Sequence, residues 1–110
     1  AIDLGESISE AARRELQEEI GYNARELIYL KRLTLSPGYM SAGIHLVLAR
    51  GLFPSQLEGD EPEPLETEIW SLSQWSELVT REDFSEGRAV AALSLVRAYL
   101  AGEFQGQTLA

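Results

Sequence analysis

Residues 6–22 read ESISEAARRELQEEIGY, and this stretch decides the fold. Ser7 and Glu10 match a capping box, in which the serine hydroxyl accepts a backbone N–H three residues on and the glutamate reaches back to the serine. Gly21 supplies a stop, because glycine readily takes the left-handed conformation that ends helices, and Asn23 lies just beyond it. The stretch therefore predicts a helix over about residues 7–20.

One side of this predicted helix is acidic. At roughly 100° per residue, Glu15, Glu18 and Glu19 fall within about 100° of one another. The neighbouring stripe is apolar and holds Ala12, Leu16 and Ile20. Each like-charge pair at these spacings costs about 0.2 to 0.5 kcal/mol, and Arg14 offsets one such pair. Taken alone, the three glutamates favour a solvated acidic face; a hard divalent cation is the alternative that removes their repulsion.

A longer pattern of residues around the three glutamates favours the divalent cation over the solvated acidic face. It consists of Glu6, seven residues, Arg14-Glu15-Leu16, one residue, Glu18-Glu19, one residue and Gly21-Tyr22. At average amino-acid frequencies these positions coincide by chance at about one starting point in 10⁸. The spacing resembles the Nudix box of the Nudix hydrolase family, whose opening glycine would stand one residue before Ala1. We therefore expect the chain to lack an N-terminal portion, which in the family supplies strands of the sheet and often a dimerising segment.

The resemblance implies an α/β fold, the Nudix α/β/α sandwich with a mixed sheet, here without its N-terminal strands. It implies that Glu15, Glu18 and Glu19 bind Mg²⁺, with Mn²⁺ as the alternative metal. Arg14 would orient these carboxylates in catalysis, and Glu6 would support the turn before the helix. In the family a backbone carbonyl before the box also binds metal, and that residue is not in this sequence. The resemblance further implies a homodimer of the full-length protein.

The composition narrows the class of protein. With 110 residues, 45% of them hydrophobic, the chain is long enough for a single domain with its own core, over residues 1–110. It has no cysteine for a disulfide or a zinc-thiolate site. A net charge of -9 opposes nucleic-acid binding, although a small phosphate ester is compatible when a divalent cation bridges it to carboxylates. No apolar run approaches the roughly 18 residues that span a bilayer. We expect a cytoplasmic protein with a small-molecule partner and neither a nucleic-acid nor a membrane partner.

The rest of the chain predicts a mixed order of strands and helices. Short apolar or β-branched runs predict strands at residues 27–30, 33–35, 44–49 and 68–70. A short helix is predicted over residues 72–78 with Ser73 as its cap, and a longer helix over about residues 86–101, ended by Gly102. The acidic residues 58–64 include two prolines and predict an exposed loop.

Two later segments resemble one branch of the family. Residues 35–39, LSPGY, and 43–49, GIHLVLA, resemble ADP-ribose pyrophosphatases, and residues 57–65, LEGDEPEPL, resemble ADP compounds hydrolases of the NudE type. This resemblance implies hydrolysis of the diphosphate bond of ADP-ribose, NADH or diadenosine polyphosphates, with release of AMP. We expect the turn to contact the substrate through Pro37, Gly38 and Tyr39. Tyr39 would do so by stacking on adenine, although a tyrosine near a turn more often packs at the surface.

The acidic loop is the expected source of the general base, because related enzymes place a carboxylate there. Glu61 is the residue that we single out, and the same role is open to Glu58, Asp60 and Glu63. A solvated loop without a catalytic role is an equal alternative for each of these residues.

Other side chains have plainer interpretations. His45 lies among apolar strand residues and is expected to make a structural hydrogen bond. Trp70 and Trp75 are expected to lie in the core. Three other functions stay open: a nucleotide-binding or sensing module without catalysis, a pyrophosphatase for other nucleoside diphosphate derivatives, and a structural partner domain. The complete glutamate set disfavours the first, and residues 36–38 disfavour the second.

Overall fold

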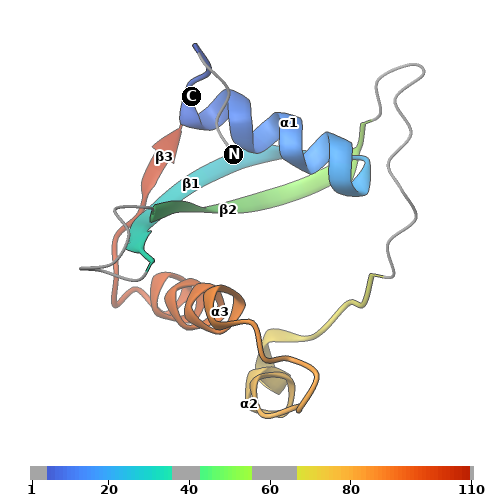
Figure 1. Ribbon diagram of the computed structural model, residues 1–110, viewed down its shortest axis with the longest axis vertical. Helices are drawn as coiled ribbons and strands as arrows, with labels where there is room; N and C mark the ends of the chain where they lie inside the picture. Colours follow the sequence, from blue (N-terminus) through green and yellow to red (C-terminus); the bar gives the residue numbers. More distant parts are fainter. Residues whose placement is uncertain (1–4, 36–42, 56–66, 110) are drawn as a thin grey trace. The chain divides into compact units, whose positions relative to one another are not determined.

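The computed structural model describes residues 5–35, 43–55 and 67–109. In chain order its elements are α1 (Ile8–Ile20), β1 (Tyr22–Thr34), β2 (Gly43–Pro54), the 3-10 helix η1 (Leu72–Gln74), α2 (Trp75–Val79), α3 (Gly87–Leu100) and β3 (Gln107–Leu109) (Figure 1). The chain divides into two compact units, one of residues 1–66 with 107–110 and one of residues 67–106. A single domain over residues 1–110 stays a prediction.

Both ends of α1 form as their capping residues predict. The Ser7 hydroxyl accepts the Glu10 N–H at 3.1 Å, and a Glu10 carboxylate oxygen accepts the Ser7 N–H at 3.3 Å. At the other end Gly21 has φ 71°, and its N–H donates to the Gln17 carbonyl at 3.0 Å. The predicted helix is confirmed, and Gly21 is the single residue between α1 and β1.

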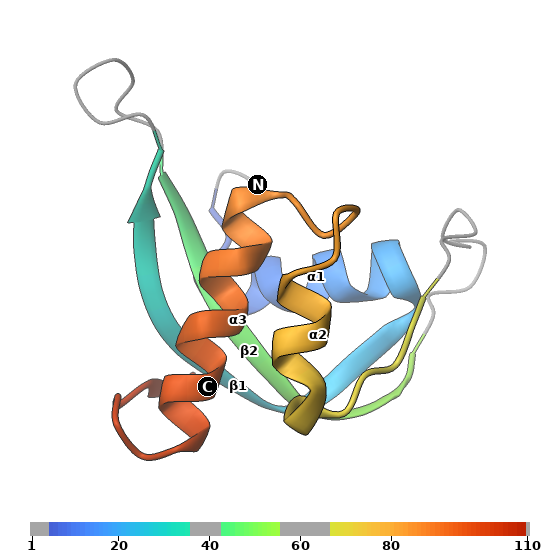
Figure 2. The ribbon, with the colours of Figure 1, turned by 90° about the horizontal axis from the view of Figure 1, so that it is seen from below.

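The first unit is built on a sheet with the strand order β2-β1-β3, antiparallel on both sides of β1. β1 and β2 form a long curved pair of strands, and α1 lies across one face of it (Figure 1, Figure 2). The runs predicted at residues 27–30 and 33–35 fall on one continuous strand, which ends at Thr34, one residue before the end of the second run. Its register against β2 shifts between Tyr29 and Lys31, as a β-bulge would shift it.

The third strand was not predicted. β3 is only three residues long, and it pairs Leu109 with Leu27 and Gln107 with Tyr29. Its sequence, QTL, carries too short a pattern to stand out from a loop. The strand predicted at residues 44–49 is confirmed and is longer at both ends.

The buried hydrophobic residues of the described chain come from α1 and β1: Ala11, Ala24, Leu27, Ile28 and Leu30. Polar contacts fix the helix to the same strands. Arg13 Nη1 donates to the Asn23 side chain and to the Ala24 carbonyl, both at 2.7 Å. Gln17 Nε2 donates to the Ser55 hydroxyl at 2.8 Å, just after the end of β2. The position of α1 against the strands is therefore set by contacts from its middle and from its C-terminal half.

The second unit begins without the strand predicted at residues 68–70. Residues 67–70 form no strand within the described chain, and the Ile69 side chain is fully exposed. That prediction was wrong. A short apolar run becomes a strand only where a neighbouring strand completes its backbone hydrogen bonds, and here none of the described segments does so.

The helices of the second unit occur where the sequence predicts them, with one corrected cap. Ser71 caps η1 by accepting the Ser73 N–H at 3.4 Å, so Ser73 is not the cap that we expected. Glu86 caps α3, and Gly102, with φ 77°, follows its last turn. Within the described ranges, no helix combines the length and apolar character needed to cross a membrane.

The two tryptophans correct a second expectation, because both are half-buried and neither belongs to the buried core. The guanidinium carbon of Arg97 lies 3.6 Å from the centre of the Trp75 ring, and that of Arg81 lies 5.4 Å from the Trp70 ring. These rings are covered by stacked cations, which attract the electron-rich ring face.

Candidate functional site

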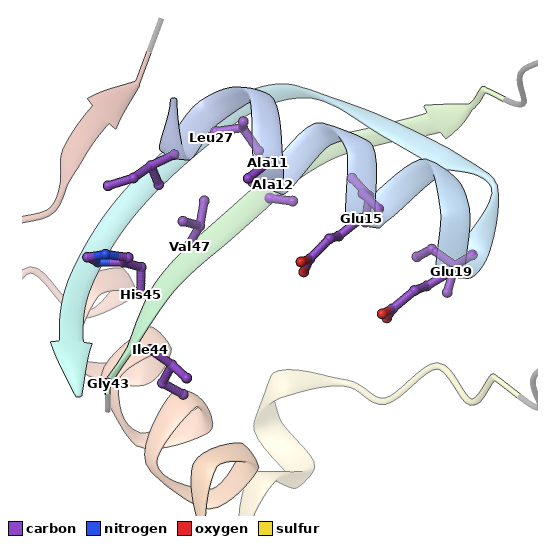
Figure 3. Close-up of a pocket in the computed structure, with 13 residues that line it drawn as sticks. Ala11, Ala12, Glu15, Glu19, Leu27, Gly43, Ile44, His45 and Val47 are labelled. Atoms are coloured by element: carbon purple, nitrogen blue, oxygen red, sulfur yellow. The ribbon is translucent and has the colours of Figure 1, made fainter. Parts of the chain in front are cut away.

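The first unit holds a pocket of about 430 Å³ between α1 and the two long strands. Glu15 and Glu19 belong to its lining and are one helical turn apart. Figure 3 shows both carboxylates extending from the same side of α1. Two of the three glutamates predicted to bind metal are therefore brought together beside a concave surface.

Most of the pocket lining is apolar. Its apolar residues are Ile8, Ala11, Ala12, Leu16, Ile20, Leu27, Gly43, Ile44, Val47 and Ala49. Its polar side chains are Glu15 and Glu19 on α1 and His45 on β2. Apolar walls with a few polar groups are typical of small-molecule sites, because the walls displace water and the polar groups orient the ligand.

Arg14 ties the acidic side of α1 to the turn that precedes it. Its guanidinium donates to both Glu6 oxygens, from Nε at 2.8 Å and from Nη2 at 3.1 Å. The same group donates through Nη1 to Glu18 Oε2 at 3.1 Å, and Nη2 lies 3.9 Å from Glu15 Oε1. The predicted spacing thus places one cation among three carboxylates, and the planar guanidinium matches the carboxylate of Glu6 in a two-bond arrangement.

Glu18 is placed differently from its two neighbours. Its carboxylate is bonded to Arg14 and is not part of the pocket lining. Across residues 5–35, 43–55 and 67–109, no three acidic or histidine side chains already converge as a metal site. The carboxylates of Glu15 and Glu19 are hard oxygen donors on one wall, a donor set that fits a divalent cation whose other ligands are water or substrate oxygens.

His45 makes the structural hydrogen bond that the sequence predicts, between its Nδ1 and the Tyr29 hydroxyl at 2.9 Å. Sequence reasoning missed its place in the pocket. The signal was present in the period-two pattern of a strand, which puts residues 43, 45, 47 and 49 on one face. All four of these residues line the pocket.

The remaining predicted site residues lie outside the described residues. These are the substrate contacts Pro37, Gly38 and Tyr39, the base Glu61, and its alternatives Glu58, Asp60 and Glu63. Ser55 donates its N–H to the Gly21 carbonyl at 2.9 Å and accepts the Gln17 side chain, so the last described residue after β2 is fixed at the C-terminal end of α1.

Comparison with known proteins gives one family and several relatives. The NUDIX domain family matches residues 1–98. ADP compounds hydrolase NudE of Escherichia coli (strain K12) is 49% identical over 102 residues, covering 93% of this chain and 55% of that protein. ADP-ribose pyrophosphatase of Bacillus subtilis (strain 168) is 29% identical over 98 residues, 87% of this chain and 53% of the relative.

A solved structure agrees with these sequence matches. A crystal structure of ADP compounds hydrolase superposes with a TM-score of 0.83 at 49% identity, covering 93% of this chain and 55% of that one. The predicted fold class and the resemblance drawn from residues 6–22 are confirmed. The chain spans about half the length of these relatives.

Proposed function

The chain belongs to the Nudix family, and from that premise we propose that it is a pyrophosphohydrolase that cleaves the diphosphate bond of ADP-containing compounds. One observation carries the proposal. Glu15 and Glu19 present two carboxylates on the helix wall of a pocket large enough for part of a nucleotide. The printed names of two relatives, an ADP compounds hydrolase and an ADP-ribose pyrophosphatase, support the substrate class.

We propose that Glu15 and Glu19 hold a divalent cation, Mg²⁺ or in its place Mn²⁺, and that Glu18 is a third, weaker ligand because Arg14 already binds it. Such a cation polarises phosphoryl oxygens and lowers the pKa of a bound water. A like-charged pair beside apolar walls attracts a cation more strongly than it would in bulk water, since the local dielectric constant is lower. The cation offsets the charge of the two carboxylates, so that an anionic diphosphate is no longer repelled and its oxygens can bind the cation.

In the reaction that we propose, a water oxygen forms a bond to one phosphorus atom of the diphosphate, and the bond from that phosphorus to the bridging oxygen breaks. From ADP-ribose the products are AMP and ribose 5-phosphate. A carboxylate accepts the water proton, and our candidate for this base remains Glu61 in the acidic segment. The two-bond contact between Arg14 and Glu6 holds the start of α1, so that the glutamates about two and three turns later keep their positions.

An assay on defined substrates tests the proposal. The protein is incubated with Mg²⁺ and ADP-ribose, NADH or a diadenosine polyphosphate, and the products are identified. We expect AMP from at least one substrate and no AMP after chelation. Glu15→Gln and Glu19→Gln should each lower turnover roughly a hundredfold, and Glu18→Gln less, about tenfold. Glu26→Gln, which changes an exposed carboxylate of β1 outside the pocket, is the matched control with the wild-type rate.

Two outcomes would contradict the proposal. Wild-type rates in both pocket variants would remove these carboxylates from the reaction. Tight binding of ADP-ribose without any AMP would mean that the pocket belongs to a nucleotide-binding module.

A homodimer and a cytoplasmic location are part of the same proposal. Light scattering of the purified full-length protein and fractionation of cells test them.

A further inference from the structure

His45 is the polar side chain that the strands contribute to the pocket. It lies on the same face of β2 as Val47 and Ala49, and its side chain is exposed to the pocket opening. Figure 3 shows His45 on the strand wall and Glu15 on the helix, with Ala12 and Val47 between them. Among the described lining residues, two carboxylates therefore lie on the helix wall of the pocket and one imidazole lies on the strand wall.

Tyr29 holds the imidazole in place. Its hydroxyl lies 2.9 Å from His45 Nδ1, and the two ring centres are 5.6 Å apart with their planes tilted by 50°. Tyr29 lies opposite Val47, so His45, two residues before Val47, is its diagonal neighbour on the same face of the strand pair. Within the described chain His45 forms its side-chain hydrogen bond through Nδ1, which leaves Nε2 for a ligand.

We propose that His45 is a substrate-positioning residue, whose Nε2 forms a hydrogen bond with a ribose hydroxyl of the bound ADP compound while Tyr29 fixes the ring. This inference rests on the function proposed above. A hydroxyl fits better than a phosphate oxygen, because the diphosphate is drawn to the cation at Glu15 and Glu19, and apolar residues separate that wall from His45. A hydroxyl accepts or donates, so it matches Nε2 in either tautomer of the neutral ring.

The role of Tyr29 follows from the same geometry. A histidine that is held by one nitrogen presents the other at a defined position, and less rotational freedom is lost when the ligand binds. Tyr29→Phe removes the hydroxyl and keeps the ring. Its effect should therefore be smaller than that of a change at His45, and it should be absent when His45 is already replaced.

The test is a cycle between protein and substrate. KM and kcat are measured with Mg²⁺ for wild type and His45→Phe, which keeps an aromatic ring against Tyr29. The substrates are ADP-ribose and analogues that lack one ribose hydroxyl at a time. We expect His45→Phe to raise KM for ADP-ribose about tenfold, or about 1.4 kcal/mol, with kcat changed less than twofold. For one deoxy analogue, wild type and His45→Phe should have the same KM, because the bond is already missing.

Two further variants separate positioning from folding. His45→Asn keeps a hydrogen-bonding side chain and should restore part of the affinity for ADP-ribose. Val47→Ala changes a neighbouring pocket residue and should show the same fold-change with every analogue. The inference fails if His45→Phe has the wild-type KM, or if its effect is equal for ADP-ribose and all analogues. Failure of the proposed function is distinct, since wild type itself would then release no AMP from ADP-ribose.

Discussion

Arg14 links the turn before α1 to the acidic face of the helix, and its contacts have a measurable worth. Its side chain is 27% exposed and that of Glu6 is 18% exposed, so their two hydrogen bonds are partly shielded from water. Arg14→Lys keeps the charge but loses the planar pair of donors. We expect the free energy of unfolding to fall by about 1 kcal/mol, measured by urea denaturation.

The matched control is Arg88→Lys, because Arg88 makes a similar ion pair with Glu86 in which both side chains are more than half exposed. Exposed pairs contribute little, so this change should leave stability nearly unaltered. Equal losses in the two variants would mean that the contact with Glu6 has no special role.

For individual residues, the sequence predicted part of the candidate site. The spacing from Glu6 to Tyr22 was enough to select the carboxylates and the arginine. The helical angles put Glu18 farthest from the apolar stripe, but they could not show that a pocket lies beside that stripe or that Glu18 binds Arg14. The sequence also left His45 as a structural residue, since the hydrogen bond to Tyr29 and the pocket beside it depend on strand register.

Among the elements, α1 depends on the left-handed residue that separates it from β1. Gly21 has φ 71°, a conformation that costs a residue with a Cβ atom about 1 kcal/mol or more. Gly21→Ala should lower the free energy of unfolding by about that amount. It should also reduce activity, because the strain falls two residues after Glu19. Denaturation and turnover measured on the same preparation check both effects.

Gly87→Ala is the control at the start of α3. Gly87 does not have a positive φ, and a Cβ there would meet nothing within 4 Å. Alanine favours helices over glycine, so stability should stay the same or rise slightly. A loss as large as that of Gly21→Ala would show that backbone conformation is not the cause.

The start of α3 depends on pH through its cap. The hydrogen bond from the Arg88 side chain, aided by the backbone N–H groups of Arg88 and Ala89, holds the pKa of the Glu86 carboxyl below its ordinary value. The folded form therefore gains stability that is complete above the ordinary pKa of about 4.3 and is lost as the pH falls through the lower, folded value. The protection of amides in the first turn of α3, taken relative to their intrinsic exchange rates at each pH, should fall below about pH 4, and Glu86→Gln should remove this dependence.

Elements with capping residues at their ends were predictable, whereas two of the strand assignments, which depend on a partner strand, were missed. α1 carries Ser7, Glu10 and Gly21, and all three signals proved correct. Residues 68–70 have the sequence pattern of a strand but form none, whereas β3 is a strand whose sequence has no recognisable strand pattern. The difference is physical, since helix hydrogen bonds are local whereas strand hydrogen bonds depend on a second segment.

For the whole molecule, the important feature is that the chain returns to its first unit at the end. β3 pairs with the middle of β1 after all of residues 67–106 have intervened. Removal of residues 107–110 would uncover one edge of β1 beside the buried Leu27. We expect the first unit to lose about 2 kcal/mol of stability.

Thr108→Val is the control for that truncation, because it keeps the strand and replaces an exposed residue with a good strand former. The free energy of unfolding of Thr108→Val should equal that of wild type, measured by urea denaturation with a signal that reports on α1. A truncated chain as stable as wild type would mean that β3 contributes nothing to the first unit.

The pairing of β1 on both edges also offers a way to detect ligands without an assay for turnover. Around Leu27 and Ile28 the strand has neighbours on either side, so amide protons there exchange with solvent chiefly when the entire sheet opens. A compound that binds the native state adds its binding free energy to the stability of the sheet, and exchange of these amide protons slows accordingly. One peptide from this strand, followed by mass spectrometry in deuterated buffer, would then rank a library of metabolites by affinity.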